Sequence, residues 1–193
     1  MELTLKPVIE CNSYTIEGLT RERVIQKLKE GDKDFSHYNL SHLNLEGINF
    51  EDANFSHSNL KGTSFSFSEI TGGDFRKATF DKTIFFDTNL TKSNFEDTDV
   101  RGAEFMLANL ESACFKGVNA TLVNFYGAKL LSSNFINADL CLANLELANL
   151  KKTKFNEIDF KGAKFRNNKC GLINWFKIIH IKLYQYILRK LYK

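Results

Sequence analysis

A large apolar residue stands at every fifth position from Phe35 to Phe165, and we call each of these the central residue of its pentad. In this series of 27 positions, 26 are Phe, Leu, Ile or Val, and Ala120 is the exception. A period of five suits neither a helix, on which five residues turn the face by about 140°, nor a continuous strand, on which an odd step changes the face. The pattern therefore predicts short extended segments separated by turns, so that the chain coils and the central residues point inward.

Comparing central residues at different separations indicates how many pentads make one coil. When central residues 20 positions apart are grouped together, they form four series. The series that begins at Phe35 is phenylalanine throughout, the series offset from it by two pentads is mostly phenylalanine, and the other two series are mainly aliphatic. This favours four pentads per coil, with identical side chains stacked along each wall. Glycine, which tolerates unusual dihedrals, stands two places after a central residue seven times, where turns are expected. The predicted core ladder is Phe35, Phe55, Phe75, Phe95, Phe115, Phe135 and Phe155.

The pentad motif resembles that of the bacterial pentapeptide repeat proteins, most clearly in residues 143–147, Ala-Asn-Leu-Glu-Leu. The resemblance covers about two-thirds of the chain. It implies an all-β solenoid, a right-handed four-sided parallel β-helix, with the central residue and a small residue two places before it inside. Twenty-seven pentads would make about seven coils of 20 residues. Members of the family differ in function, since some shield DNA gyrase from quinolones or peptide toxins and others are secreted effectors, so the fold implies little about activity.

The sequence pattern divides the chain into three parts: 1–31, 32–170 and 171–193. The first contains an extended or irregular leading segment and a predicted capping helix, for which Thr20 is the expected N-cap and Gly31 the expected stop. The second is the repeat β-helix, and the third is a basic amphipathic helix. A solenoid needs a cap because its open end would expose apolar rings and unpaired backbone. The apolar stripe of the capping helix is Val24, Ile25 and Leu28.

The C-terminal part has apolar residues at helical spacing and a strongly basic composition. Residues 166–193 hold seven basic residues and no acidic one. Interior cations make membrane insertion costly, and three uses remain open: a homodimer contact, which resembles the C-terminal helices of some gyrase-protecting relatives, peripheral contact with an anionic membrane, or docking on its own coil. The length exceeds what a cap needs, which favours the first two. The predicted helix face is Leu172, Trp175, Phe176, Ile179, Leu183, Tyr186, Ile187 and Leu191.

Apolar residues also occur at positions that should face outward. Several share a 20-residue spacing and would stack on the outside of the coil, where a contiguous apolar surface is typical of an interaction site. The alternative is that the C-terminal segment packs over them. We call the predicted set the interaction strip, and it comprises Phe86, Met106, Tyr126, Leu107 and Leu147.

Charged and metal-binding chemistry gives weaker signals. His37 and His57 are 20 apart and would be neighbours, but Lys77 follows in the same series and no third ligand is evident, so solvated histidines are favoured over a metal site. An acidic group between Glu96 and Glu104 could mimic DNA only as part of a long negative surface, which lysines interrupt towards the C-terminus.

No catalytic constellation is evident, and a filled coil offers no cleft, so neither an enzyme nor a cofactor is expected. The leading interpretation is a non-catalytic scaffold that presents a rigid surface to an unidentified protein partner, as a homodimer formed through the C-terminal helix, without direct nucleic-acid binding. The alternatives are gyrase protection by DNA mimicry and a membrane-associated or secreted effector. Four cysteines without metal or disulfide spacing, and the lack of a signal peptide, indicate the cytoplasm, although an effector secreted without such a signal would look the same.

Overall fold

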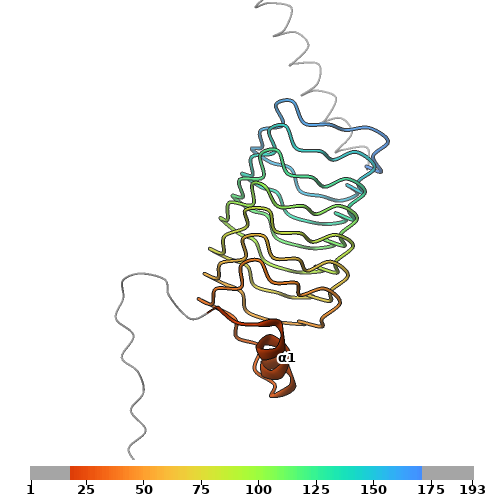
Figure 1. The fold of residues 1–193 in the computed structure, drawn as a ribbon. Helices are drawn as coiled ribbons and strands as arrows, with labels where there is room; N and C mark the ends of the chain where they lie inside the picture. The colour runs from red at the N-terminus through yellow and green to blue at the C-terminus, as the bar shows by residue number, and fades with distance from the viewer. Residues whose placement is uncertain (1–17, 171–193) are drawn as a thin grey trace, which may run out of the picture.

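The chain winds into a solenoid of stacked coils, as seen in a computed structural model that describes residues 18–170 (Figure 1). Parallel single-residue bridges join positions 20 apart, from Asp34 and Asn54 to Asn149 and Lys169. Within the described residues the β-structure consists of these isolated bridges, one in each side of the coil, separated by two-residue turns. Each coil therefore takes four pentads. The leading segment 1–17 and the predicted C-terminal helix, 171–193, lie outside the described residues.

The residue before each central residue explains how the chain turns every five positions. Asn54 Oδ1 accepts the backbone N–H of Ser56 at 3.0 Å, and the same bond recurs from Glu96 to Asn94 at 2.9 Å. Such a bond mimics a backbone turn, which is why Asn and Asp are frequent at this position. The second turn residue adopts a left-handed conformation, with φ of 60° at His57 and 66° at Gly127. Every side of the coil is therefore closed by the same local geometry.

The inside of the coil is filled by aromatic rings in two ladders. Phe75, Phe95 and Phe115 are fully buried, and their ring centroids are 4.7 and 4.8 Å apart with the planes nearly parallel. The second ladder consists of Phe65, Phe85, Phe105 and Phe125. Its ring planes are nearly perpendicular to those of the first, and Phe95 meets Phe105 edge to face at 5.5 Å. Both arrangements are favourable for aromatic pairs beyond the burial of their area. The members of the predicted core ladder lie inside the coil, from Phe35 to Phe155.

Several buried hydroxyl groups at the small inward position link successive coils, while those of Ser58, Thr98 and Ser133 bond within their own coil. Thr83 Oγ1 donates to the carbonyl oxygen of Leu60 in the preceding coil at 2.8 Å, and Thr63 bonds Leu40 in the same way. In residues 18–170, no buried side-chain nitrogen or oxygen lacks a hydrogen-bond partner. The polar atoms inside this coil are thus compensated.

The helix α1, Arg21–Lys29, lies across the N-terminal end of the solenoid (Figure 1). Thr20 caps it by accepting the backbone N–H of Arg23 at 3.3 Å. Val24 is fully buried and belongs to the core of the coil. Lys27 is also buried, which the sequence pattern does not predict: its Nζ pairs with Asp32 and lies 5.1 Å from the centre of the Tyr38 ring. The helix thus covers the first coil with an apolar side chain and a cation held over an aromatic ring.

Candidate interaction surfaces

The most exposed large apolar residues of the described chain all occupy the second position of a turn. Each has a left-handed backbone, with φ between 58° and 64°. Leucine and phenylalanine are disfavoured in this region, where Gly, Asn and Asp are enriched. Both the backbone conformation and the solvent exposure at these positions are therefore unfavourable for large apolar side chains. We call them the exposed turn residues, and they are Phe67 (58% exposed), Leu107 (40%), Leu122 (68%), Leu142 (52%) and Leu147 (43%).

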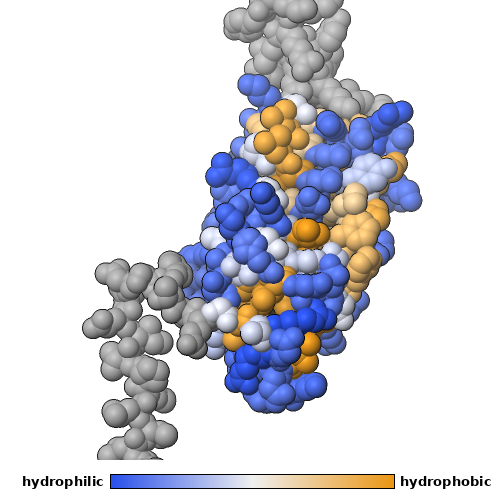
Figure 2. All heavy atoms as spheres, viewed as in Figure 1, coloured by the Kyte–Doolittle hydropathy of each residue, from blue (hydrophilic) through white to orange (hydrophobic). Residues whose placement is uncertain are grey.

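The interaction strip and the exposed turn residues meet at one corner of the coil. Phe86, Met106 and Tyr126 are half-buried at the first turn position, beside the second position that Leu107 and Leu147 occupy. On the face of the coil drawn in Figure 2, apolar atoms gather in patches among polar ones.

Phe67 belongs to the same corner and was missed in the sequence, although it lies 40 residues before Leu107. Its ring meets that of Phe86 edge to face at 5.4 Å. Leu122 and Leu142 occupy the neighbouring corner, because a single coil side, residues 143–145, separates the turns 141–142 and 146–147. Two adjacent corners therefore carry exposed apolar groups.

Several carboxylates of the coil form ion pairs with nearby cations. Asp99 pairs with Arg101 at 2.6 Å, and the hydrogen bond from this guanidinium is the main reason that the pKa of the Asp99 carboxyl is lowered. Asp74 and Arg76 form the same pair at 2.7 Å, two residues apart. Glu96 pairs with a lysine of the next coil, Lys116, at 2.6 Å. These pairs break up the acidic row that DNA mimicry would require.

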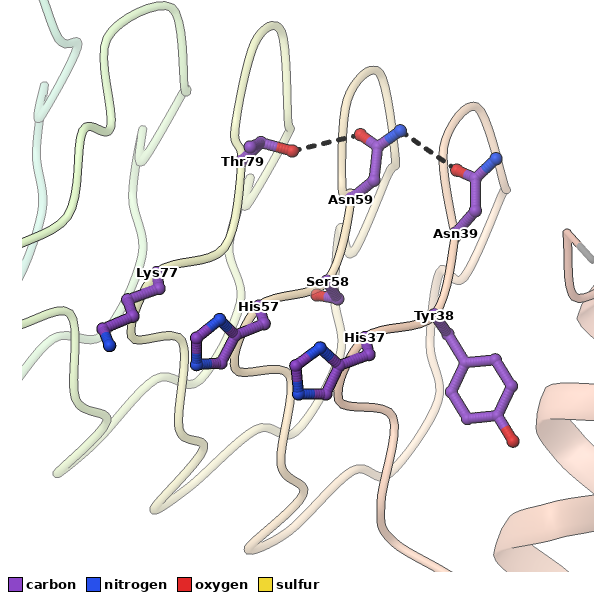
Figure 3. A pocket seen from close by; sticks show the side chains of 8 residues that line it. All are labelled: His37, Tyr38, Asn39, His57, Ser58, Asn59, Lys77 and Thr79. Carbon is purple, nitrogen blue, oxygen red and sulfur yellow. Dashed lines mark hydrogen bonds between the residues drawn. The ribbon is translucent and has the colours of Figure 1, made fainter. Parts of the chain in front are cut away.

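A groove of about 340 Å³ crosses three coils near α1 (Figure 3). Residues at the second turn position of successive coils form one edge of the groove. Residues on the adjoining side of the same coils form the other edge. The rings of His37 and His57 stack with their centroids 4.6 Å apart and their planes 11° from parallel. Burial, followed by the charges of His37 and Lys77, lowers the pKa of His57. The groove is lined by His37, Tyr38, Asn39, His57, Ser58, Asn59, Lys77 and Thr79.

Two features of the described part of the chain concern metal binding and thiol chemistry. No group of three or more His, Cys, Asp or Glu residues between positions 18 and 170 could hold a metal ion. Burial, together with hydrogen bonds to Asp139 and Asp159, raises the pKa of the Cys141 thiol to about 12. This thiol therefore stays protonated at neutral pH and is a poor nucleophile.

None of the helices in residues 18–170 is both long and apolar enough to cross a lipid bilayer. The C-terminal segment lies outside this range.

A family model for pentapeptide repeats matches most of the solenoid in eight copies. The chain belongs to the pentapeptide repeat family. The fold of the family is a right-handed four-sided parallel β-helix, in agreement with the bridges between positions 20 apart, and the family is not associated with catalysis. The matched residues are 34–66, 48–85, 68–105, 83–119, 103–141 and 143–170.

Several solved structures of the family resemble this chain, at low sequence identity. HetL, involved in heterocyst differentiation regulation in the cyanobacterium Nostoc sp. strain PCC 7120, is 17% identical over 80% of this chain and 95% of its own, with a TM-score of 0.40. QnrB1, a plasmid-mediated fluoroquinolone resistance protein, is 18% identical over 77% and 90%, with a TM-score of 0.37. Rfr23 from the cyanobacterium Cyanothece 51142 is 21% identical over 78% and 99%, with a TM-score of 0.28. No curated protein matches the sequence. These similarities concern the fold and say nothing of the role of this chain.

Proposed function

We propose that this protein is a non-catalytic cytoplasmic scaffold that binds a protein partner through the interaction strip and the exposed turn residues. The observation that carries the proposal is the coincidence of exposure and left-handed backbone at Phe67, Leu107, Leu122, Leu142 and Leu147. The fold gains little from such residues, because a left-handed conformation costs about 1 to 2 kcal/mol for a residue with a Cβ. An apolar surface that the fold does not need is typical of a binding site.

Packing within the coil accounts for only part of this surface. A Cβ atom on Gly127 would lie 2.6 Å from Leu107 Cδ2, so Leu107 covers the glycine of the next coil, and Leu142 covers Gly162 in the same way at 2.5 Å. Leu107 nevertheless remains 40% exposed, and Leu142 remains 52% exposed. The packing role therefore leaves apolar area available to a partner.

Replacing Leu107 and Leu147 with asparagine should remove binding of the partner without lowering the stability of the fold. Asparagine tolerates the left-handed backbone, so we expect the free energy of unfolding to change by less than about 1 kcal/mol. Affinity capture from cells, analysed by mass spectrometry, should recover a partner with the native chain and lose it with the variant. Ser112, an exposed residue at the same turn position on another corner, provides the matched control Ser112→Asn. Equal recovery with all three chains would refute a role for the strip.

We further propose that the chain divides into the parts 1–31, 32–170 and 171–193, and that it dimerises through the last. Charge supports this proposal. The segment 171–193 contains five basic residues and no acidic one, whereas Asp87, Glu104 and Glu146 border the interaction strip. A basic segment with apolar residues at helical spacing complements an apolar strip with an acidic border.

Dimerisation is tested by placing charges on the predicted helix face. Ile179→Asp together with Leu183→Asp should convert the dimer to a monomer, halving the mass measured by size exclusion with light scattering, because two carboxylates cannot enter an apolar contact without partners. Gln185→Asp adds a carboxylate to the same segment outside the predicted face and should leave the dimer intact. A native chain with monomer mass would contradict the proposal.

The alternatives have less support. DNA mimicry needs an uninterrupted negative surface, and four carboxylates of the coil are paired with cations of the same chain: Asp74, Asp81, Glu96 and Asp99. Contact of residues 171–193 with a membrane predicts co-sedimentation with anionic vesicles at low salt. Binding of that kind by an intact dimer would add a second role to the segment.

A further inference from the structure

The groove beside α1 has two edges that cross three successive coils (Figure 3). His37, His57 and Lys77 form the first edge, at equivalent turn positions with φ between 60° and 63°. The second edge consists of Asn39, Asn59 and Thr79 on the adjoining coil side. Because coils repeat at about 4.8 Å, both edges present a polar group at each level.

Hydrogen bonds fix which way the two amides of the second edge point. The backbone N–H of Ser41 donates to Asn39 Oδ1 at 3.1 Å, and that of Lys61 donates to Asn59 Oδ1 at 3.1 Å. A backbone N–H can only donate, so the oxygen must face the turn in both residues.

The amide oxygens are further occupied by a ladder between coils. Thr79 Oγ1 donates to Asn59 Oδ1 at 3.1 Å, and Asn59 Nδ2 donates to Asn39 Oδ1 at 3.1 Å. Each oxygen therefore accepts two hydrogen bonds, which uses its lone pairs. Each Nδ2 carries two hydrogens, and the ladder uses one hydrogen of Asn59 and neither of Asn39. The two amides of the second edge are thus left with N–H donors, while the Thr79 hydroxyl, whose hydrogen is used, can only accept.

The first edge also supplies donors and positive charge. Lys77 has an ammonium group, and each imidazole is a donor in both protonation states. The charged and titratable groups that act on His57 are His37, Lys77, Asp74 and Arg76. The Asp74 carboxylate is already held by Arg76 at 2.7 Å, and the residues lining the groove include no carboxylate. Asp97 follows Lys77 at the next turn, beyond the lining.

We propose that this groove binds an oxyanion, a carboxylate or phosphate group carried by a small molecule or by an acidic side chain of a protein, and that binding strengthens on acidification. An anion would lie between two rows of donors and accept from the imidazoles, from Lys77 and from the free amide hydrogens. Charge-assisted hydrogen bonds of this kind are stronger than neutral ones. The site is separate from the interaction strip and does not depend on the proposed scaffold function.

The direction of the pH effect follows from the His57 environment. Burial and the neighbouring charges lower the pKa of His57, so the ring is mainly neutral at pH 7 in the free protein. A bound anion favours the protonated ring and raises this pKa, so that binding takes up a proton. Affinity must then rise as the pH falls through the range in which His57 titrates.

Titration of the full-length protein with sulfate tests the site, because sulfate remains a dianion between pH 5.5 and pH 7.5. At constant ionic strength, we expect the side-chain amide signals of Asn39 and Asn59 to shift in NMR spectra. The apparent Kd should be at least about fivefold lower at pH 5.5 than at pH 7.5. His57→Asn should abolish most of this pH dependence while keeping a residue that tolerates the left-handed turn.

His42 provides a matched control, because it is an exposed histidine with φ of 60° at the same turn position on another corner. His42→Asn should leave sulfate binding unchanged. The proposal is overturned if sulfate leaves the two amide signals in place, or if His42→Asn weakens binding as much as His57→Asn does. Parallel titrations with inorganic phosphate and with a blocked glutamate distinguish the sources: tighter phosphate binding indicates a free anion or phosphoryl group, and tighter glutamate binding indicates an acidic side chain.

Discussion

Replacing Phe95 with alanine is expected to lower the free energy of unfolding by about 3 to 5 kcal/mol. Phe95 is fully buried at the middle of the core ladder, stacked on Phe75 at 4.7 Å and on Phe115 at 4.8 Å. Its ring also meets Phe105 edge to face at 5.5 Å. The coils on both sides are fixed by their backbone bridges, so the wall cannot collapse into the space that the ring leaves. The loss therefore includes a cavity as well as the transfer of the ring to water.

Chemical denaturation followed by circular dichroism measures this loss, with Phe67→Ala as the comparison. Phe67 is also a phenylalanine of the coil, but it is 58% exposed and has the edge-to-face contact with Phe86. Its replacement should cost less than about 1 kcal/mol. Similar losses in the two variants would mean that the stacked ladder is not the main source of stability.

The difference between these two phenylalanines could be predicted from the sequence because the period of five separates inside from outside. Phe95 is a central residue, and Phe67 stands two places after one. In a coil with four equal sides, residues 20 apart lie directly above one another, so contacts such as that between Phe75 and Phe95 follow from numbering alone. The core was therefore predictable residue by residue, without knowledge of any angle.

The turns were less predictable from the residues. Glycine marked some of the left-handed positions, but the same conformation occurs at Leu122, with φ of 64°, and at Lys77, with φ of 60°. The bridges to adjacent coils impose this geometry at whatever residue occurs there, together with the Asx hydrogen bond where Asn or Asp precedes the central residue. Intrinsic preference is thus overridden, and the exposed turn residues become recognisable as costly only once the backbone is known.

The groove and the ion pairs could not be predicted from the sequence, for a different reason. The sequence placed His37 beside His57 and gave Lys77 as the next member of the series. The orientation of Asn39 and Asn59, which decides that the groove presents donors, depends on hydrogen bonds from turn N–H groups and from the next coil. A period predicts which residues are neighbours, but not which atoms of those residues remain free.

Replacing Val24 with aspartate is expected to detach α1 and expose the end of the first coil. Val24 is fully buried within the core cluster, so the new carboxylate would have to enter an apolar site without a partner or force the helix away. We expect a loss of about 3 kcal/mol or more from the stability of this end. Lys27 would leave its place over Tyr38 at the same time, because both belong to the same short helix. Since a solenoid depends on its caps for solubility, the variant should also self-associate.

Hydrogen exchange resolved along the chain measures the effect of Val24→Asp, because each coil rests only on its neighbours. The backbone N–H of Phe35 bonds the carbonyl oxygen of Asn54 at 2.7 Å and should lose protection, whereas that of Phe115, bonded to Asn134 at 2.7 Å far from the helix, should keep it. Arg23→Asp places the same charge one residue earlier on an exposed part of α1, near the helix N-terminus, where a carboxylate is tolerated. Protection at Phe35 should then be retained. Equal exchange at Phe35 in both variants and in the native chain would show that the first coil is stable without its helix.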